Sequence, residues 1–211
     1  MDFWHFLKQL TDPASILHYG GVALLLAVIF AETGLLIGFF LPGDSLVFLS
    51  GMFCSTQPEL MGVNISVLLP MMIIAAFLGN LAAYWFGKKT GTALFSREDS
   101  FFFKKRYLET TRDFYSRHGG KTLVIGRFLP VIRTFAPILA GVIGVDLKKF
   151  LLYNISGAAA WITSVGLGGY FLGRIKWVEE NVGYIVIALI IVTLIPLFWA
   201  SVRRARARRK T

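Results

Sequence analysis

Cysteine and charge are both scarce in this chain of 211 residues. Cys54 is the only cysteine, which excludes an internal disulfide and any zinc or iron–sulfur site built on cysteines. Only 16% of the residues are charged, whereas 55% are hydrophobic and the mean hydropathy is +0.64. The net charge is nevertheless +10, and a soluble nucleic-acid-binding domain reaches such a value by enriching the whole chain in charged residues. The composition excludes that class and indicates lipid as the main solvent.

The N-terminus lacks the pattern of a secretory signal peptide. Residues 1–19 hold a single Lys and mix polar with aromatic residues, whereas a signal peptide needs a basic start, an apolar run and a small-residue cleavage site. We expect this segment to form an interfacial amphipathic helix, with a disordered leader as the alternative. Its apolar residues are Phe3, Trp4, Phe6, Leu7 and Leu10.

Three uncharged apolar stretches are long enough to cross a bilayer, which takes about 20 residues. They are residues 67–87, 150–173 and 182–202. We predict a transmembrane helix for each of them, and we assign the last to a C-terminal segment, residues 175–202.

Two further apolar regions are interrupted. Residues 20–54 break at Pro42-Gly43, and residues 122–145 break at Pro130 and Pro137. A proline removes a backbone donor and disfavours helix in the residue before it, so a helix–turn–helix is expected at each break. Two conventional spans in the first region would leave the second with only about nine apolar residues, which is too short to cross. We therefore predict two re-entrant helical hairpins, which other parts of the protein must shield from lipid.

An internal repeat supports this interpretation. The tripeptide Phe-Leu-Pro at 40–42 recurs at 128–130, and a glycine follows each copy, at Gly51 and at Gly141. An aromatic-rich helix end follows later in each half, at residues 84–88 and 170–174. Because one span separates the hairpins, the second must enter from the opposite membrane face. We predict an all-α integral membrane protein built on inverted repeats, as in many secondary transporters.

Basic residues set the expected orientation. The segment 88–121 holds nine Lys or Arg residues against four acids, and the tail after the last span holds six and no acid. By the positive-inside rule, both are cytoplasmic. The predicted organisation is an N-terminal segment (1–19), a membrane domain (20–174) made of repeat 1 (20–87), a cytoplasmic amphipathic linker (88–121) and repeat 2 (122–174), a C-terminal transmembrane segment (175–202) and a basic tail (203–211).

Four charged residues lie inside the interrupted apolar regions: Glu32, Asp44, Arg127 and Arg133. A charge at the centre of a membrane helix costs roughly 2.5–3.5 kcal/mol on insertion scales, so such residues indicate function. The two acids and two bases sum to zero and can pair if the hairpin tips meet. Arginines beside a broken helix suit a phosphate group, and Glu32 could exchange a proton during transport. Two structural alternatives stay open, an internal clasp and, for Asp44, a helix N-cap.

Other polar and helix-breaking residues could line the same site. The candidates are Pro42, Gly43, Pro130, Thr134, Asn80 and Tyr84, together with Asn154 and Trp161. For the polar residues within spans, hydrogen bonding between helices is an equally good explanation. His118, next to a glycine pair, could serve as a proton-exchanging group, but an interfacial histidine before a turn fits a structural role better. Gly157 is expected to allow close helix packing.

These motifs resemble the DedA family of bacterial inner-membrane proteins, whose wider superfamily carries SNARE-associated or VTT domains. The resemblance covers residues 20–174 and rests on residues 40–44, 118–121 and, above all, Gly126-Arg127-Phe128-Leu129-Pro130-Val131-Ile132-Arg133-Thr134 with Ala140-Gly141. It implies translocation of undecaprenyl phosphate or another phospholipid, often driven by the proton motive force. It also implies that the family's essential acids fall on Glu32 and Asp44, and its essential arginines on Arg127 and Arg133.

We predict a proton-coupled lipid transporter in which the two arginines bind a phosphate head group and the two acids pair with them and carry protons. The alternative is a proton-coupled cation or small-molecule antiporter that serves pH and membrane-potential homeostasis. An enzyme such as a lipid phosphatase is disfavoured, because no nucleophile, metal-ligand cluster or Gly-rich phosphate loop accompanies the arginines. No cofactor, metal or nucleic acid is expected. The expected partners are a membrane lipid and protons, and homo-oligomers are left open.

Overall fold

The computed structural model describes residues 13–35, 41–95, 121–128, 130–181, 183–185 and 188. All regular structure in this part of the chain is helical, in agreement with the predicted fold class. The elements are α2 (Pro13–Gly34), α3 (Gly43–Thr56), α4 (Pro58–Met61), α5 (Ile65–Phe95), α7 (Lys121–Ile125), the 3-10 helix η2 (Gly126–Phe128), α8 (Pro130–Val142), α9 (Leu147–Leu172) and α10 (Lys176–Glu180).

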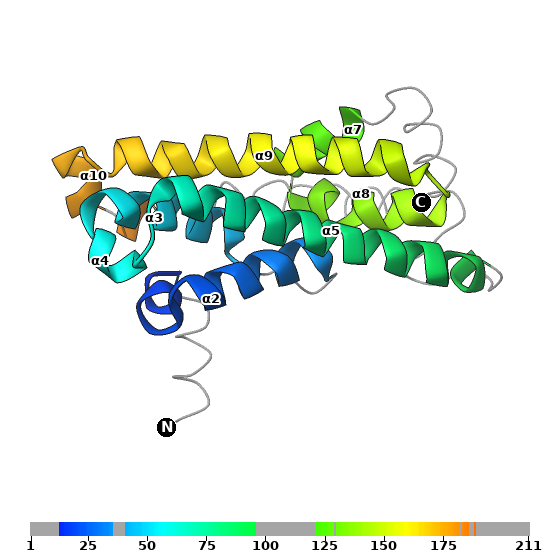
Figure 1. Cartoon of the computed structure of the whole chain (residues 1–211), viewed down its shortest axis with the longest axis horizontal. Helices are drawn as coiled ribbons and strands as arrows, with labels where there is room; N and C mark the ends of the chain where they lie inside the picture. The colour runs from blue at the N-terminus through cyan, green and yellow to red at the C-terminus, as the bar shows by residue number, and fades with distance from the viewer. Residues whose placement is uncertain are drawn as a thin grey trace, which may run out of the picture.

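Two helices, α5 and α9, are long and apolar enough to cross a membrane, over Ile65–Gly91 and Leu147–Leu172. They correspond to the predicted spans 67–87 and 150–173. Both expose large apolar side chains such as Ile74, Leu78 and Leu152, as lipid-facing helices do. The two helices run in opposite directions along the longest axis of the molecule (Figure 1). Several predicted segments lie outside the described residues. They are the N-terminal segment before residue 13, most of the linker with His118, the basic tail, and the predicted span 182–202 apart from residues 183–185 and 188.

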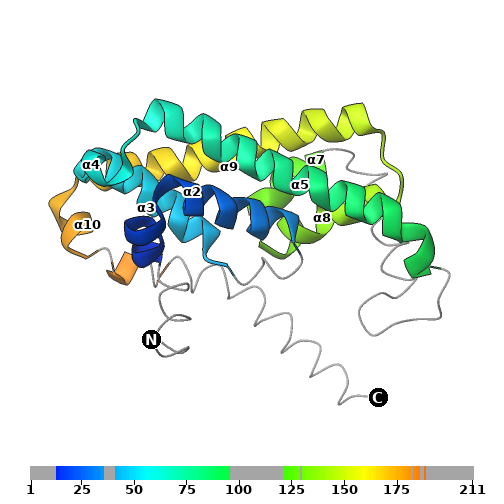
Figure 2. The same ribbon diagram turned by 60° about the horizontal axis from the view of Figure 1, so that its bottom comes forward.

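Shorter helices flank the long pair. At the end where α5 begins, α2 packs against α3 and α5, and α3 packs against α9. At the other end, α8 packs against α5, and α7 packs against α9 (Figure 1 and Figure 2). The apolar part of α2, Gly20–Gly34, follows a kink at Gly21, where φ is +54°. α3 has 14 residues and α8 has 13, so each is shorter than the roughly 20 residues that cross a bilayer.

Two of the three predicted breaks are correct in position. α3 begins directly after Pro42, and α8 begins at Pro130 after the turn η2. The predicted interruption at Pro137 is wrong, because α8 continues through it to Val142. Pro137 removes only the donor to the carbonyl four residues earlier, and the close contact of the following turn with α5 keeps this segment helical.

α3 and α9 approach each other backbone to backbone. A Cβ atom on Gly51 of α3 would overlap the carbonyl oxygen of Gly166 on α9. In the reverse direction, a Cβ atom on Gly169 would overlap the carbonyl oxygen of Phe48. Only glycine permits this distance between the helices at either position.

The same arrangement recurs between α8 and α5. A Cβ atom on Gly141 of α8 would overlap the carbonyl oxygen of Tyr84 on α5, and a Cβ atom on Gly87 would overlap the carbonyl oxygen of Ile138. In both interfaces, each glycine faces the carbonyl of the residue that lies three positions before the packing glycine of the partner helix. The two halves of the chain therefore use equivalent contacts with the long helices exchanged.

These contacts also set the correspondence between the halves. Gly51 matches Gly141, the glycines that follow the two copies of the tripeptide, although they lie 9 and 11 residues after its proline. In the long helices, Gly87 matches Gly169. The aromatic ends 84–88 and 170–174 would instead pair Gly87 with Gly173, one helical turn later. Packing glycines fix how the helices align, whereas aromatic residues gather wherever a helix reaches the membrane interface.

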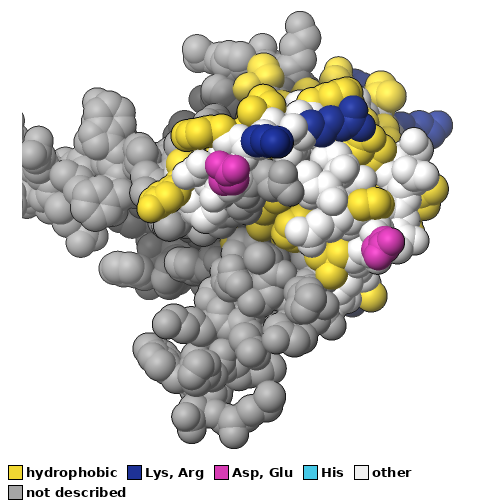
Figure 3. Space-filling model, turned by 90° about the vertical axis from the view of Figure 1, so that its left-hand side faces the viewer, with side chains coloured by type: hydrophobic (Ala, Val, Ile, Leu, Met, Phe, Trp, Pro, Cys, Tyr) yellow, Lys and Arg dark blue, Asp and Glu magenta, His cyan; other side chains and the backbone are white. Residues whose placement is uncertain are grey.

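The end of the molecule that holds α4 and α10 carries both charged and apolar side chains (Figure 3). Arg174 and Lys176 are exposed there, beside Trp177, whose side chain is 66% exposed. The guanidinium of Arg174 covers the Tyr170 ring, 4.5 Å from its centroid. Aromatic and basic residues of this kind are typical of a helix end at a membrane surface.

Candidate functional site

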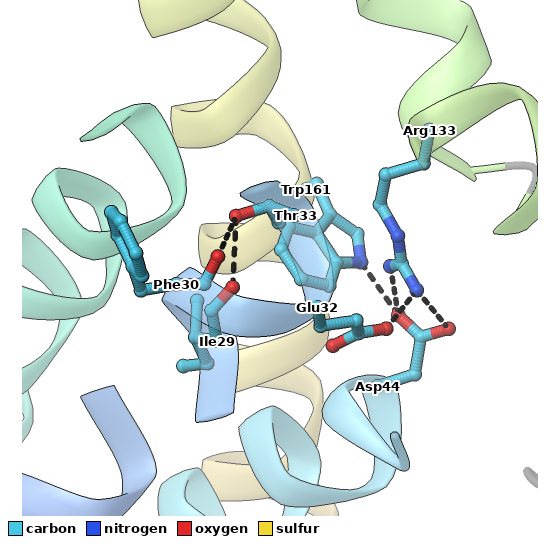
Figure 4. A network of polar contacts seen from close by, with 7 residues as sticks. All are labelled: Ile29, Phe30, Glu32, Thr33, Asp44, Arg133 and Trp161. Carbon is cyan, nitrogen blue, oxygen red and sulfur yellow. Dashed lines mark hydrogen bonds and ion pairs between the residues drawn. The ribbon is translucent and has the colours of Figure 1, made fainter. Parts of the chain in front are cut away.

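Arg133 of α8 binds two carboxylates that come from other helices (Figure 4). Its Nη2 donates to Oε1 of Glu32 on α2, and its Nη1 donates to Oδ1 of Asp44 on α3 over 2.7 Å. The side chains of Arg133 and Glu32 are each only 2% exposed, whereas that of Asp44 is 21% exposed. Three of the four predicted charges thus meet where α2, α3 and α8 converge, and Asp44 is the member nearest to solvent. We call Glu32, Asp44 and Arg133 the charged triad.

Trp161 of α9 closes the charged triad from a fourth helix. Its Nε1 donates to Oδ1 of Asp44 over 2.8 Å, the same oxygen that Arg133 binds. The face of its ring lies 4.4 Å from Cζ of Arg133, a cation–π contact (Figure 4). Trp161 is 1% exposed, so it both fills the core and orients the Asp44 carboxylate.

Arg127 is as deeply buried but is bound differently. It lies in η2, is 1% exposed, and donates from Nη2 to Oδ1 of Asn154 on α9. Within the described residues it has no carboxylate partner, and its Nε and Nη1 atoms have no hydrogen-bond partner. The expected even pairing of two acids with two arginines is therefore wrong, because both acids bind Arg133. The turn η2 faces α9, whereas Arg133 lies far enough along α8 to reach α2 and α3.

Two buried amides connect Arg127 to the surrounding helices. Asn154 donates from Nδ2 to the Phe77 carbonyl of α5 over 3.1 Å. We assign the Asn80 amide with its oxygen towards Arg127. The opposite orientation lets Nδ2 donate to Asn154 Oδ1, but it sets that nitrogen against Arg127 Nη2 and the amide oxygen against the Thr33 carbonyl. In the assigned orientation, Asn80 accepts from Arg127 Nη2 over 2.6 Å and donates to the Thr33 carbonyl of α2 over 2.9 Å. The amides thus both join helices and contact a charged residue.

Glycines make room for two of the buried charges. A Cβ atom on Gly43 would overlap Oε2 of Glu32. A Cβ atom on Gly157 would lie 3.0 Å from Cδ and 3.2 Å from Nε of Arg127, closer than side chains normally pack. The sequence assigned Gly157 to helix packing and missed its contact with Arg127. Its spacing in α9, three residues after Asn154 and four before Trp161, is the signal that places all three on one helix face.

The other candidates occupy different positions. The carbonyl of Pro42 accepts the first hydrogen bond of α3, from the Leu46 nitrogen over 2.9 Å. Thr134 is buried next to Arg133 in α8, which begins at Pro130. Tyr84 lies elsewhere, since its hydroxyl donates to the Val145 carbonyl over 2.6 Å and its ring stacks on Phe150. In the part of the chain that the structure describes, no three His, Cys, Asp or Glu side chains gather as metal ligands would.

Two membrane-length helices that enclose buried ion pairs define an all-helical membrane protein with an internal polar site. The VTT domain pattern matches residues 41–171. Protein DedA of Escherichia coli K12 is 38% identical over 88% of this chain and 84% of its own length. An uncharacterized membrane protein of Mycobacterium tuberculosis H37Rv is 40% identical over 88% and 80%, and inner membrane protein YghB of Escherichia coli K12 is 29% identical over 90% and 84%. The chain belongs to the DedA family of VTT-domain membrane proteins. No solved structure matches it.

Proposed function

We propose that this protein carries an anionic phosphate lipid across the bacterial inner membrane, and that its buried charged residues bind the head group during the crossing. Undecaprenyl phosphate or another phospholipid is the proposed cargo. One observation carries the proposal: Arg127, Arg133 and Glu32 are buried, and Asp44 binds Arg133 beside them. The segments that carry these four residues, the apolar part of α2 with α3, η2 and α8, are each too short to span a bilayer. The relative YghB of Escherichia coli is an inner membrane protein, which supports the location.

The short helices fit two re-entrant hairpins, α2 with α3 and α7 with α8. Both hairpins would enter the membrane from opposite faces and meet near its centre. The equivalent glycine contacts in the two halves and the opposite directions of α5 and α9 support this inverted repeat. Charges at the meeting point would be out of reach of water at either surface.

Competition for Arg133 gives a mechanism for coupling lipid to protons. A phosphate and the two carboxylates are alternative partners for the same guanidinium. Oε2 of Glu32 has no hydrogen-bond partner among the described residues, so it can receive a proton there. A protonated Glu32 holds Arg133 less strongly and releases Nη2 to the phosphate. Loss of the proton on the other side of the membrane restores the ion pair and expels the lipid, which is the differential binding that a transport cycle requires.

Movement between leaflets in proteoliposomes tests the proposal. The purified protein is reconstituted with a fluorescent polyprenyl phosphate, and the fraction in the outer leaflet is followed by chemical quenching. We expect the wild-type protein to accelerate exchange and Arg127→Ala/Arg133→Ala to abolish it. Lys148→Ala/Lys149→Ala removes two exposed charges at the start of α9 and is the matched control. Equal exchange with and without the protein would overturn the proposal, and a cation-driven pH change in vesicles without polyprenyl phosphate would favour an antiporter.

A further inference from the structure

The two buried arginines are compensated in opposite ways. Arg133 is bound by two carboxylates and is covered by the Trp161 ring, and of its guanidinium nitrogens Nε has no hydrogen-bond partner among the described residues. Among the described residues, the hydrogen bonds of Arg127 go only to neutral amide oxygens, both through Nη2. Two arginines that look equivalent in the sequence are therefore unequal in the fold.

A guanidinium in this situation is expensive to bury. A buried charge without a counter-ion loses several kcal/mol of hydration, and an amide oxygen repays only part of it. Arg127 still keeps this position at 1% exposure, since Gly157 leaves space for it and two amides fix its Nη2. Its Nε and Nη1 remain free to donate among the described residues. An anion at these atoms would supply both the missing charge and the missing acceptors.

We propose that Arg127 is the primary phosphate-binding residue, that Asn80 and Asn154 position its guanidinium, and that Arg133 joins only after a carboxylate of the charged triad has released it. This inference rests on the proposed function and divides its binding site into two steps. The ligand is a phosphate group, whether on a lipid or free in solution. The order follows from the contacts, because a phosphate at Arg127 displaces no ion pair, whereas one at Arg133 must displace Glu32 or Asp44.

Asn154→Asp is the most informative variant. The change is isosteric and sets a carboxylate against Arg127, so the arginine receives an internal counter-ion that competes with phosphate. It leaves every contact of the charged triad in place. We expect the phosphate affinity to fall by about 30-fold or more, the size expected when a buried charge pair is lost. The protein should still fold, because the new ion pair with Arg127 offsets the lost hydrogen bond from Asn154 Nδ2 to the Phe77 carbonyl. A purely structural role for Arg127 would leave the phosphate affinity unchanged.

The experiment is calorimetric titration of the full-length protein in detergent with farnesyl phosphate and with inorganic phosphate. Asn64→Asp, an identical change at an exposed residue before α5, is the control and should bind like the wild type. Arg127→Gln is the second variant, in case Asn154→Asp does not fold, and it too should lose binding. Wild-type affinity for farnesyl phosphate in a folded Asn154→Asp or Arg127→Gln protein overturns the inference.

The two ligands separate this inference from the proposed function. Strong binding of farnesyl phosphate and weak binding of inorganic phosphate, both dependent on Arg127, support both. Equal binding of the two ligands through Arg127 supports the site and contradicts a lipid cargo. Binding of farnesyl phosphate that ignores Arg127 leaves the lipid cargo standing and removes the role of Arg127. If the wild-type protein binds neither ligand, both proposals are wrong.

Discussion

At the scale of single residues, Asp44 Oδ1 connects three helices. It accepts from Arg133 of α8 and from Trp161 of α9 while belonging to α3, and its side chain is the least buried of the charged triad. A shift of any of these three helices would therefore change the hydrogen bonds of this oxygen. Glu32 is enclosed instead, with Gly43 against one oxygen and Arg133 against the other.

Glu32→Gln separates the charge of this residue from its shape. The amide oxygen can still accept from Arg133, so we expect the protein to fold and insert normally. The side chain can no longer gain or lose a proton, so transport should stop responding to an imposed pH gradient. The measurement is leaflet exchange of a polyprenyl phosphate in vesicles with and without that gradient. Glu59→Gln, at an exposed acid in α4, should keep the wild-type response, and the account fails if Glu32→Gln does too.

Trp161 should contribute to stability through its ring and its donor separately. Trp161→Phe keeps an aromatic face over Arg133 but loses the hydrogen bond to Asp44, which we expect to cost about 1.5–3 kcal/mol. Trp161→Ala also leaves a cavity and should cost roughly 3–5 kcal/mol in total. Unfolding in mixed micelles of increasing SDS content measures both. Trp177→Phe, at an exposed position, should be neutral, and an equal effect of the two Phe variants would contradict the Asp44 contact.

The sequence identifies the charged residues but does not show which of them pair with one another. The cost of charge in lipid selects Glu32, Asp44, Arg127 and Arg133 from the chain without any structure. The partners depend on which helix face each residue occupies after packing, and the spacing of Arg127 and Arg133 leaves this undetermined. The position of Gly157 could have been found from helical periodicity, whereas the enclosure of Glu32 by Gly43 depends on how α2 meets α3.

At the scale of the elements, glycines determine how closely the short helices approach the long ones. Each interface uses reciprocal glycine-to-carbonyl contacts. α9 also contains a neighbouring glycine, Gly168, and no atom of another described element lies within 4 Å of its Cβ position. Gly168 and Gly169 are thus adjacent on one helix, but only Gly169 packs against α3. The sequence shows a run of small residues here but does not distinguish packed members from open ones.

Alanine at these positions should have opposite effects. Gly169→Ala forces a methyl group against the Phe48 carbonyl, and we expect it to cost about 1–3 kcal/mol. Gly87→Ala should cost a similar amount because it occupies the equivalent position in the other half. Gly168→Ala should be neutral or stabilising by up to about 1 kcal/mol, from helix propensity alone. Unfolding in SDS mixed micelles gives the comparison, and equal costs for Gly168→Ala and Gly169→Ala would rule out the α3–α9 interface described.

At the scale of the whole molecule, the two halves supply charged side chains of opposite sign to one site. Each half supplies one long helix and one pair of short helices, with Glu32 and Asp44 in the first half and Arg127 and Arg133 in the second. The two acids compensate Arg133 across the halves, whereas Arg127 is buried against neutral amides. The recurring tripeptide predicts a repeat, and the packing contacts show which glycines of the long helices are equivalent.

Surface labelling tests the arrangement of this repeat in the membrane. In a Cys54→Ser background, cysteines are introduced at Glu59 or Trp177, at one end of the molecule, and at Lys148, at the other. We expect an impermeant thiol reagent to label positions 59 and 177 from outside the cell, and position 148 only in inverted vesicles. Labelling of positions 59 and 148 from the same side would contradict an odd number of crossings between them and, with it, the inverted repeat.

The most direct test of the account is a structure of the protein in a lipid nanodisc with a bound short polyprenyl phosphate. The account predicts phosphate density within hydrogen-bonding distance of Arg127, on the side of Arg133, with the lipid chain leaving between the helix pairs. It further predicts that this density is absent in Asn154→Asp. Head-group density confined to the outer surface or to the basic tail, with the charged triad intact and Arg127 unchanged, would contradict it.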